Sequence, residues 1–367
     1  MANLIKYKLG DITKIKTGKL DANASSPNGK YPFFTCSKDI LNIDSYSYDC
    51  ECVLVAGNGD LNVKYYNGKF DAYQRTYIIE DNSDGRLYMP YLYFFLELYI
   101  EELRNQSIGG VIKYIKLGNL TNAIIKLPSI EKQKNIVDIL QKSRNIINNK
   151  DIQLQEYDQL IKSRFVELFG DVTKKNNGYT INDVCRTMIR GPFGSSLKKE
   201  FFVPKGDSTY KVYEQKHAIN KKVQIGEYYI DEKKFNELKR FEVQPGDVIM
   251  SCSGTIGEFF VVPDSAERGI INQALLNFRL NYEMINKDYF LYAMYAIIDT
   301  IESKGSGIEN ITSVSNIKNT NIYLPPLLEQ NNFSIFVEQV DKLKFEVQKS
   351  LDESQTLFDS LMQEYFG

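Results

Sequence analysis

Apolar residues recur at spacings of three and four through two stretches of about forty residues each, which predicts two long amphipathic helices. Neither stretch contains an internal proline or glycine, and each follows a Leu-Pro pair, where proline is compatible with the start of a helix. We expect the helices at residues 129–169 and 326–366. The residues predicted to form their apolar stripes are Ile136, Leu140, Ile147, Leu154, Ile161 and Leu168 in the first helix, and Phe333, Val337, Val347, Leu351, Phe358 and Tyr365 in the second.

The two stretches are copies of one another. A shift of about 197 positions places Leu127-Pro128 on Leu324-Pro325 and Gln133 on Gln330 without a gap, which indicates a repeated architecture. A helix of about 60 Å with one apolar stripe needs a partner of similar length. We therefore expect the copies to pair as an antiparallel coiled coil, because the chain must leave one globule and reach the other at the far end. Two ordinary amphipathic helices on separate globules are the alternative.

The sequence between the helices predicts two mixed α/β globules with the same element order. A strand-like run opens the first at 6–16, and an apolar strand then enters a glycine turn at 52–60 in the first globule and 247–255 in the second. Each globule continues with an aromatic-rich helix and a closing glycine loop, at 107–110 and 305–307. The fold class is thus mixed α/β with an internal pseudo-twofold repeat. The expected domains are 1–128, 129–171, 172–325 and 326–367.

Composition and charge narrow the class of protein. A chain of 367 residues with 43% hydrophobic content can bury more than one core. It has no apolar run of eighteen residues and no signal peptide, so we expect a soluble, cytoplasmic protein without a membrane partner. Its five cysteines form no CxxC pair, which favours free thiols over a zinc site. Net charge is −2, yet 172–240 holds fifteen basic and eight acidic residues, the best candidate footprint for a polyanion.

Catalytic and cofactor motifs are weak or missing. The glycines at 56–60 follow an apolar strand, but a lone GxG is a poor nucleotide or S-adenosylmethionine signature, and the repeat copy keeps only one glycine. No GxxxxGK[ST] occurs, and neither does the Asn-Pro-Pro-aromatic signature of amino-methyltransferases. A Mg²⁺ nuclease could be drawn from Asp207, Glu214 and Lys216, but Glu-x-Lys recurs elsewhere by chance. His217 is the only histidine, so we expect no catalysis and no metal or cofactor site in this chain.

The arrangement resembles the specificity (S) subunit of type I restriction-modification systems over the whole chain. The resemblance is carried by the two Leu-Pro…Gln helix entries and by two segments of the second globule, 191–197 (GPFGSSL) and 253–257 (SGTIG). The first globule lacks a Gly-Pro-Phe-Gly-Ser segment. The resemblance implies that each globule reads one half of a bipartite double-stranded DNA site and that the helices set the spacer.

The resemblance also implies partners. Two methyltransferase (modification) subunits would dock on the helices and supply adenine N6 methylation, and restriction subunits would supply ATP-driven cleavage. S-adenosylmethionine, ATP and Mg²⁺ would then belong to those partners. The residues predicted to contact DNA are Lys16, Lys19, Lys38, Asn58, Lys64, Gln74 and Arg75 in the first globule, and Arg190, Phe193, Ser195, Ser196, Lys198, Lys199, Lys216, Lys221, Lys222, Ser253, Thr255 and Gln273 in the second.

A second hypothesis is a non-enzymatic scaffold whose helices recruit proteins and whose globules bind peptide or glycan. The basic block at 172–240 disfavours it, and the acidic remainder favours it. A salt titration of binding to duplex DNA separates the two hypotheses, because phosphate contacts make affinity salt-dependent.

Overall fold

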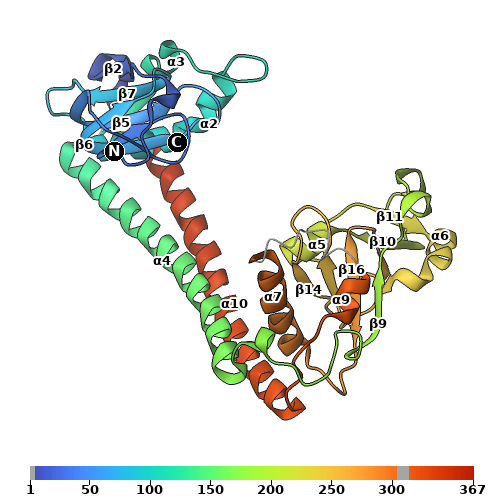
Figure 1. Ribbon diagram of the computed structural model, residues 1–367. Helices are drawn as coiled ribbons and strands as arrows, with labels where there is room; N and C mark the ends of the chain where they lie inside the picture. Colours follow the sequence, from blue (N-terminus) through green and yellow to red (C-terminus); the bar gives the residue numbers. More distant parts are fainter. Residues whose placement is uncertain (1–4, 304–313) are drawn as a thin grey trace. The chain divides into compact units, whose positions relative to one another are not determined.

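The computed structural model describes residues 5–303 and 314–367, so the predicted glycine loop at 305–307 lies outside the described residues. The chain divides into two compact units. Unit 1 comprises Met1–Gln153 and Val347–Gly367, and unit 2 comprises Leu154–Glu346. Two helices of forty residues, α4 (Ile130–Phe169) and α10 (Leu327–Phe366), each contribute to both units, which confirms the predicted long helices (Figure 1).

Unit 1 is built on a six-stranded sheet of order β2-β7-β5-β6-β3-β4, in which only the β3–β6 pair is parallel. Helix α2 packs on β5 and β6, and its Tyr91, Phe94 and Phe95 rings lie against Phe358 and Phe366 of α10. A separate antiparallel pair joins β1 to β8. The elements are β1 (Ile5–Lys8), α1 (Leu9–Ile12), β2 (Thr13–Thr17), η1 (Ala22–Ala24), β3 (Tyr31–Phe34), β4 (Leu41–Ile43), β5 (Tyr48–Ala56), β6 (Val63–Ala72), β7 (Thr76–Asp81), α2 (Met89–Gln106), α3 (Leu117–Thr121) and β8 (Ile124–Leu127).

Unit 2 contains two four-stranded sheets, β14-β13-β16-β9 and β11-β10-β15-β12, with β10–β15 the parallel pair. Helix α7 covers the first sheet through Phe290, whose ring meets Phe278 at 5.3 Å. The elements are η2 (Val172–Lys174), β9 (Cys185–Arg190), η3 (Gly194–Ser196), η4 (Lys199–Phe201), β10 (Thr209–Tyr213), α5 (Gln215–Asn220), β11 (Tyr229–Asp231), α6 (Glu232–Glu237), η5 (Lys239–Phe241), β12 (Glu242–Val243), β13 (Val248–Ser251), β14 (Phe259–Val261), β15 (Gly269–Ile271), β16 (Leu275–Leu280), α7 (Lys287–Ser303) and α9 (Val314–Asn319).

The predicted opening strand at 6–16 is interrupted. Residues 9–12 form the single helical turn α1 between β1 and β2. Leu9 and Ile12 are both buried, and a spacing of three residues places two side chains on one face of a helix, whereas in a strand it places them on opposite faces. Burial of both residues in the same core therefore favours the turn.

Each unit contains one antiparallel pair of helix segments. In unit 1, Ile136 and Leu140 of α4 share a core with Phe358 and Met362 of α10. In unit 2, the Phe165 and Phe333 rings lie 5.4 Å apart, and Lys344 donates to Asp158 at 2.6 Å. As residue numbers rise along α4, those of the partners on α10 fall, so the predicted antiparallel pairing holds within each unit.

The predicted apolar stripe of α4 needs one correction, at the carboxyl end of the helix. Leu168 is 40% exposed, and the adjacent Phe169 is buried against Phe333 and Tyr289 instead. Phe165 and Phe169 are four residues apart, which keeps both rings on one helix face. The other residues predicted for the two apolar stripes differ in burial. Those that are buried include Ile161, Phe333, Val337 and Phe358, and those that are half-buried are Ile147, Leu154, Val347, Leu351 and Tyr365.

The repeated glutamines anchor the helices to their globules. Gln133 is fully buried, accepts from Tyr88 N at 2.9 Å and donates to Arg86 O at 2.8 Å. Gln330 repeats the arrangement: it accepts from Asn286 N at 2.8 Å and donates to Met284 O at 3.2 Å. The side-chain amide of Gln133 also donates to Pro128 O, and that of Gln330 donates to Pro325 O. These contacts explain why the Leu-Pro…Gln pattern occurs twice.

Among the described residues, no helix is both long enough and apolar enough to cross a membrane.

Candidate nucleic-acid interface

Four segments of unit 2 that are distant in sequence meet at one end of its sheets. They are the end of β9, the start of α5, the β13–β14 loop and the β15–β16 loop. Backbone hydrogen bonds join them: Gly191 N to Leu275 O at 3.0 Å, Cys252 N to Ala274 O at 2.7 Å, and Asn272 N to Tyr213 O at 2.9 Å. This group of segments, which we call the unit 2 loop edge, brings together Arg190, Ser253 and Gln273, three of the residues predicted from the sequence to contact DNA.

Gly191 and Arg190 hold the unit 2 loop edge together. A Cβ at Gly191 would lie 1.9 Å from Asn272 O, so only glycine permits this approach of the two backbones. Arg190 donates to Gln273 O at 3.2 Å and to Cys252 O at 3.5 Å. Its guanidinium lies 5.1 Å from the ring centroid of Phe193, which is 60% exposed. An exposed aromatic ring beside a cation is a surface that can contact a base or a sugar.

The start of α5 adds an amide that sequence reasoning missed. Gln215 accepts a hydrogen bond from Ser253 Oγ at 3.3 Å, and Thr255 in the same loop is exposed. His217, fully buried beneath, accepts from Glu214 N at 2.9 Å through Nδ1 and donates from Nε2 to Ile225 O at 2.7 Å. Burial lowers the pKa of His217, which favours this neutral form. His217 thus has a role in the fold, and it fixes the backbone from which Gln215 projects.

The cations predicted in unit 2 differ in their contacts. Lys199 and Lys222 are exposed and form no salt bridge with any described residue, as expected for phosphate-binding groups. Lys198 pairs loosely with Glu200 at 3.7 Å, and Lys216 pairs with Glu214 at 2.8 Å. Ser195 and Ser196 are exposed in η3.

Lys221 differs from the other predicted cations in its surroundings. It caps the carboxyl end of α5, away from Gln215, with a left-handed backbone. It lines a cavity of about 510 Å³ together with Asp158, Glu258 and Asp299. Lys162 also lines this cavity, so its lining carries both signs of charge, and the predicted contact of Lys221 with DNA stays a prediction.

Unit 1 builds an equivalent edge from different residues. Gly18 N donates to Thr76 O at 3.1 Å, and a Cβ at Gly18 would lie 2.1 Å from Ala72 O. Gly57 N donates to Arg75 O at 2.8 Å, as Cys252 N does to Ala274 O in unit 2. Gly18 is therefore the counterpart of Gly191, although no Pro-Phe follows it. The sequence signal that could have identified Gly18 is a glycine directly after a strand.

The predicted contact residues of unit 1 fall into exposed and internal groups. Lys19, Gln74 and Arg75 are exposed, and Gln74 donates to Asp21 at 2.8 Å. Gln74 and Arg75 also line a polar cavity of about 290 Å³ with Gly57. Half-buried Asn58 forms a backbone bridge to Tyr114.

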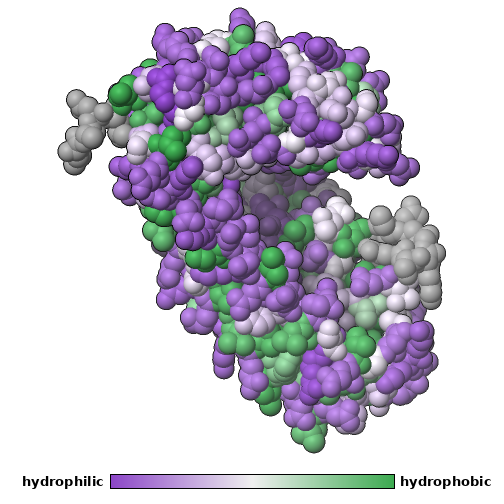
Figure 2. All heavy atoms as spheres, turned by 90° about the vertical axis from the view of Figure 1, so that its left-hand side faces the viewer, coloured by the Kyte–Doolittle hydropathy of each residue, from purple (hydrophilic) through white to green (hydrophobic). Residues whose placement is uncertain are grey.

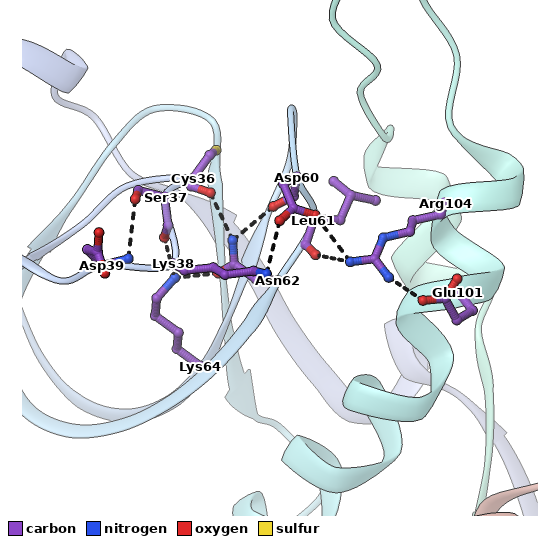
Figure 3. A network of polar contacts seen from close by, with 10 residues as sticks. All are labelled: Cys36, Ser37, Lys38, Asp39, Asp60, Leu61, Asn62, Lys64, Glu101 and Arg104. Carbon is purple, nitrogen blue, oxygen red and sulfur yellow. Dashed lines mark hydrogen bonds and ion pairs between the residues drawn. The ribbon is translucent and has the colours of Figure 1, made fainter. Parts of the chain in front are cut away.

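Two half-buried lysines predicted to bind DNA have partners within unit 1. Lys64 is half-buried, donates to Ser37 O at 2.7 Å and contacts the Asn62 side chain, and burial lowers its pKa (Figure 3). Lys16 is paired with Glu80 and lies over the Tyr48 ring. Both lysines have partners within unit 1, and their contact with DNA stays a prediction.

Lys38, which the sequence also predicted to contact DNA, remains at the surface. It pairs with Asp60 at 3.3 Å, and Asp60 also pairs with Arg104 at 3.3 Å (Figure 3). The hydrogen bond from Lys38 is the main cause of the lowered pKa of the Asp60 carboxyl. Because the pair is exposed and screened by water, a phosphate can compete with Asp60 for Lys38.

Within residues 5–303 and 314–367, no three His, Cys, Asp or Glu side chains are grouped to hold a metal ion. Both loop edges instead present amides, hydroxyls and cations, which are the groups that proteins use to contact nucleic acids.

Two mixed α/β units with equivalent loop edges and antiparallel helix segments define a duplicated recognition protein. The chain belongs to the family of type I restriction modification DNA specificity domains, whose family model matches residues 3–156 and 173–354.

Relatives with similar sequences carry matching names. The chain is 38% identical over 174 residues to the type I restriction enzyme EcoDI specificity subunit of Escherichia coli, a match that covers 46% of this chain and 38% of that protein. It is 22% identical over 345 residues to the putative type I restriction enzyme specificity subunit S.HindORF215P of Haemophilus influenzae, covering 88% of this chain and 83% of that protein.

Solved structures share the fold at low identity. The S subunit of a type I restriction-modification system from M. genitalium aligns with all of this chain and 97% of its own at a TM-score of 0.58 and 15% identity. A chain from a study of complex assembly and conformational transition of the type I R-M system aligns at a TM-score of 0.59 and 16% identity, covering 100% of this chain and 98% of its own.

Proposed function

We propose that this protein selects the DNA sequence on which a type I restriction-modification complex acts, with each unit reading one half of a bipartite site. The observation that carries the proposal is the repeated loop edge. Gly18 and Gly191 make the same close backbone approach, yet the side chains around them differ. The same backbone arrangement with two different sets of exposed side chains suits the reading of two different DNA half-sites.

The chemistry expected of this chain is binding alone. Exposed lysines such as Lys199 and Lys222 would contact phosphates and position the units, while amides and hydroxyls of the loop edges would contact base edges. Adenine N6 methylation and ATP-driven cleavage would take place on modification and restriction subunits. S-adenosylmethionine, ATP and Mg²⁺ would be bound there, and the complex would work in the cytoplasm.

Methylation mapping tests this proposal. The chain, co-expressed with the methyltransferase subunits of its source, should direct methylation to two fixed half-sites separated by a spacer of constant length and variable sequence. Methylation at one continuous site, or at no preferred sequence, would contradict bipartite reading. A strong fall in duplex-DNA affinity with rising salt is also expected, whereas salt-independent binding would favour the peptide- or glycan-binding scaffold.

We propose further that α4 and α10 set the spacer length. The chain enters α4 and α10 beside the buried anchors Gln133 and Gln330, so the start of each helix is fixed to one globule. Insertion of seven residues in both helices, after Asn149 and after Ser354, preserves the apolar stripe and adds about 10 Å. At about 3.4 Å per base pair, the spacer should lengthen by about three base pairs with both half-sites unchanged. An unchanged spacer would rule the helices out as its determinant.

The proposed modification subunits would dock on a second apolar stripe. Ile139, Ile146 and Leu160 of α4 are 42%, 50% and 47% exposed. Their repeat counterparts on α10 are Phe336, half-buried, and Leu343 and Leu357, 50% and 57% exposed. Figure 2, which views the left-hand side of Figure 1, shows hydrophobic side chains at the surface among hydrophilic ones. Two equivalent stripes support two copies of one partner.

Matched substitutions test the two docking stripes. Native mass spectrometry of the co-expressed complex should show one modification subunit after Ile146→Asp or Leu343→Asp, and none after both changes. Phe345→Asp is the control, because Phe345 is 68% exposed but lies off the stripe. Retention of two modification subunits by the double variant would exclude these stripes as the docking surface.

A further inference from the structure

The unit 2 loop edge exposes two side-chain amides, Gln215 and Gln273, and their surroundings differ. Gln273 is exposed, and Arg190 fixes its backbone through the Gln273 carbonyl. Gln215 is half-buried, and its side-chain oxygen accepts from Ser253 Oγ at 3.3 Å. Among the described residues of this edge, a side-chain hydrogen bond therefore orients the amide of Gln215 and none orients that of Gln273.

The backbone on the α5 side of this contact is also fixed. His217 bonds both to Glu214, the residue before Gln215, and to Ile225 O. Gly254 has a φ of +65°, and an added Cβ there would lie 3.4 Å from Gln215 Nε2. A contact group held in this way loses little conformational entropy when it binds.

We propose that Gln215, oriented by Ser253, reads an adenine in the half-site bound by unit 2; the inference rests on the proposed function. The Ser253 bond uses one lone pair of the Gln215 oxygen and leaves the second lone pair and the NH₂ group for a ligand. In the major groove, adenine presents an acceptor at N7 beside a donor at N6, and the glutamine amide matches both at once. Guanine presents two acceptors and cytosine a donor alone, so neither fits the oriented amide.

Arg190, the obvious candidate for reading a guanine, serves another purpose in this edge. Its guanidinium spans two loops through Gln273 O and Cys252 O and stacks beside Phe193. It therefore shapes the frame in which Gln215 sits. Gln215, oriented by Ser253, would contact the base, and Arg190 would hold the loop that carries Ser253.

The test compares four variants of the complete methyltransferase complex, Gln215→Ala, Gln215→Glu, Ser253→Ala and Gln273→Ala, on a DNA library randomised through both half-sites. Gln215→Ala should reduce discrimination at one adenine of one half-site by about tenfold, with the other half-site and the spacer unchanged. Gln215→Glu should shift that position toward cytosine, because a carboxylate accepts from cytosine N4. Ser253→Ala should relax the same position more weakly. Gln224→Ala is the control, since Gln224 is exposed outside the four segments.

The outcomes separate this inference from the proposed function. If the wild-type complex shows no bipartite preference, the proposed function itself fails. If the wild type is bipartite and Gln215→Ala keeps every preference, or loses methylation evenly at all positions, the reading role of Gln215 is excluded. Relaxation by Gln273→Ala and not by Gln215→Ala would assign the role to the other amide. If Gln215→Ala fails to assemble, an unchanged profile for Ser253→Ala overturns the proposal.

Discussion

Lys150 of α4 donates to both the carbonyl and the hydroxyl of Ser350 on α10, at 2.9 and 2.7 Å, and also to Ser354 Oγ at 2.7 Å. Polar contacts inside an apolar helix pair favour one register over the shifted alternatives, in which such groups lose their partners. Lys150 therefore fixes the register of the helix pair in unit 1.

Replacing Lys150 tests this role. Lys150→Ala should lower the free energy of unfolding by about 1–2 kcal/mol, because charge-assisted hydrogen bonds are lost. Lys142→Ala is the control, since Lys142 forms only an exposed pair with Asp138 at 2.7 Å and should cost about 0.5 kcal/mol or less. Urea denaturation measures both. Equal costs for the two variants would contradict a register role.

The anchoring glutamines should be among the most sensitive polar positions of the chain. Gln133→Ala leaves the Tyr88 amide without its partner, and Gln330→Ala does the same to Asn286. Each should cost about 1–3 kcal/mol, the penalty of a buried unsatisfied group. Exposed Gln339→Ala is the control on α10. Thermal and urea unfolding would measure the loss in the free energy of unfolding. If Gln133→Ala or Gln330→Ala lost no more than Gln339→Ala, the anchoring role of that glutamine would be wrong.

Stability should fall in mild acid because of His217. Burial lowers the pKa of this histidine below its ordinary value of 6.5. Below that value the unfolded chain binds a proton that the folded chain does not, so acid favours unfolding. The wild type should therefore lose more stability than His217→Gln between about pH 7.5 and about pH 5.5 in urea titrations. Because the chain has one histidine, parallel losses would show that His217 does not titrate differently on folding.

Lys198 and Lys199 should contribute sequence-independent affinity. Their replacement by alanine should weaken binding to every duplex and reduce the salt dependence by a slope of about 0.9 per lost phosphate contact. Lys233→Ala with Lys239→Ala changes the same charge at exposed positions on α6 and η5. Fluorescence anisotropy at several salt concentrations measures both slopes. The same slope for both double variants would remove Lys198 and Lys199 from the interface.

The sequence predicted the repeated elements well because repetition supplies an internal comparison. The Leu-Pro…Gln entries and the apolar spacing located both helices to within one residue of their observed starts. Leu168 was misplaced because Leu168 and Phe169 both fit an apolar spacing, and only tertiary packing chooses between them.

The loop edges were harder to predict from sequence. Lys64 lies on a strand with alternating exposure, but contacts with residues 36–39 bury it, and no local pattern shows that contact. Gly18 and Gln215 escaped notice because their importance comes from backbone segments about fifty or more residues away in the first case and from Ser253 in the second. Long-range contacts of this kind need coordinates.

The most direct test of bipartite reading is a domain exchange followed by methylation mapping of the complete complex. Residues 1–127 would be replaced by the matching segment of the Haemophilus influenzae relative, with α4, unit 2 and α10 kept intact. We predict that one half-site changes to a new sequence, while the other half-site and the spacer length stay as in the parent. A change in both half-sites, or in neither, would contradict the assignment of one half-site to each unit.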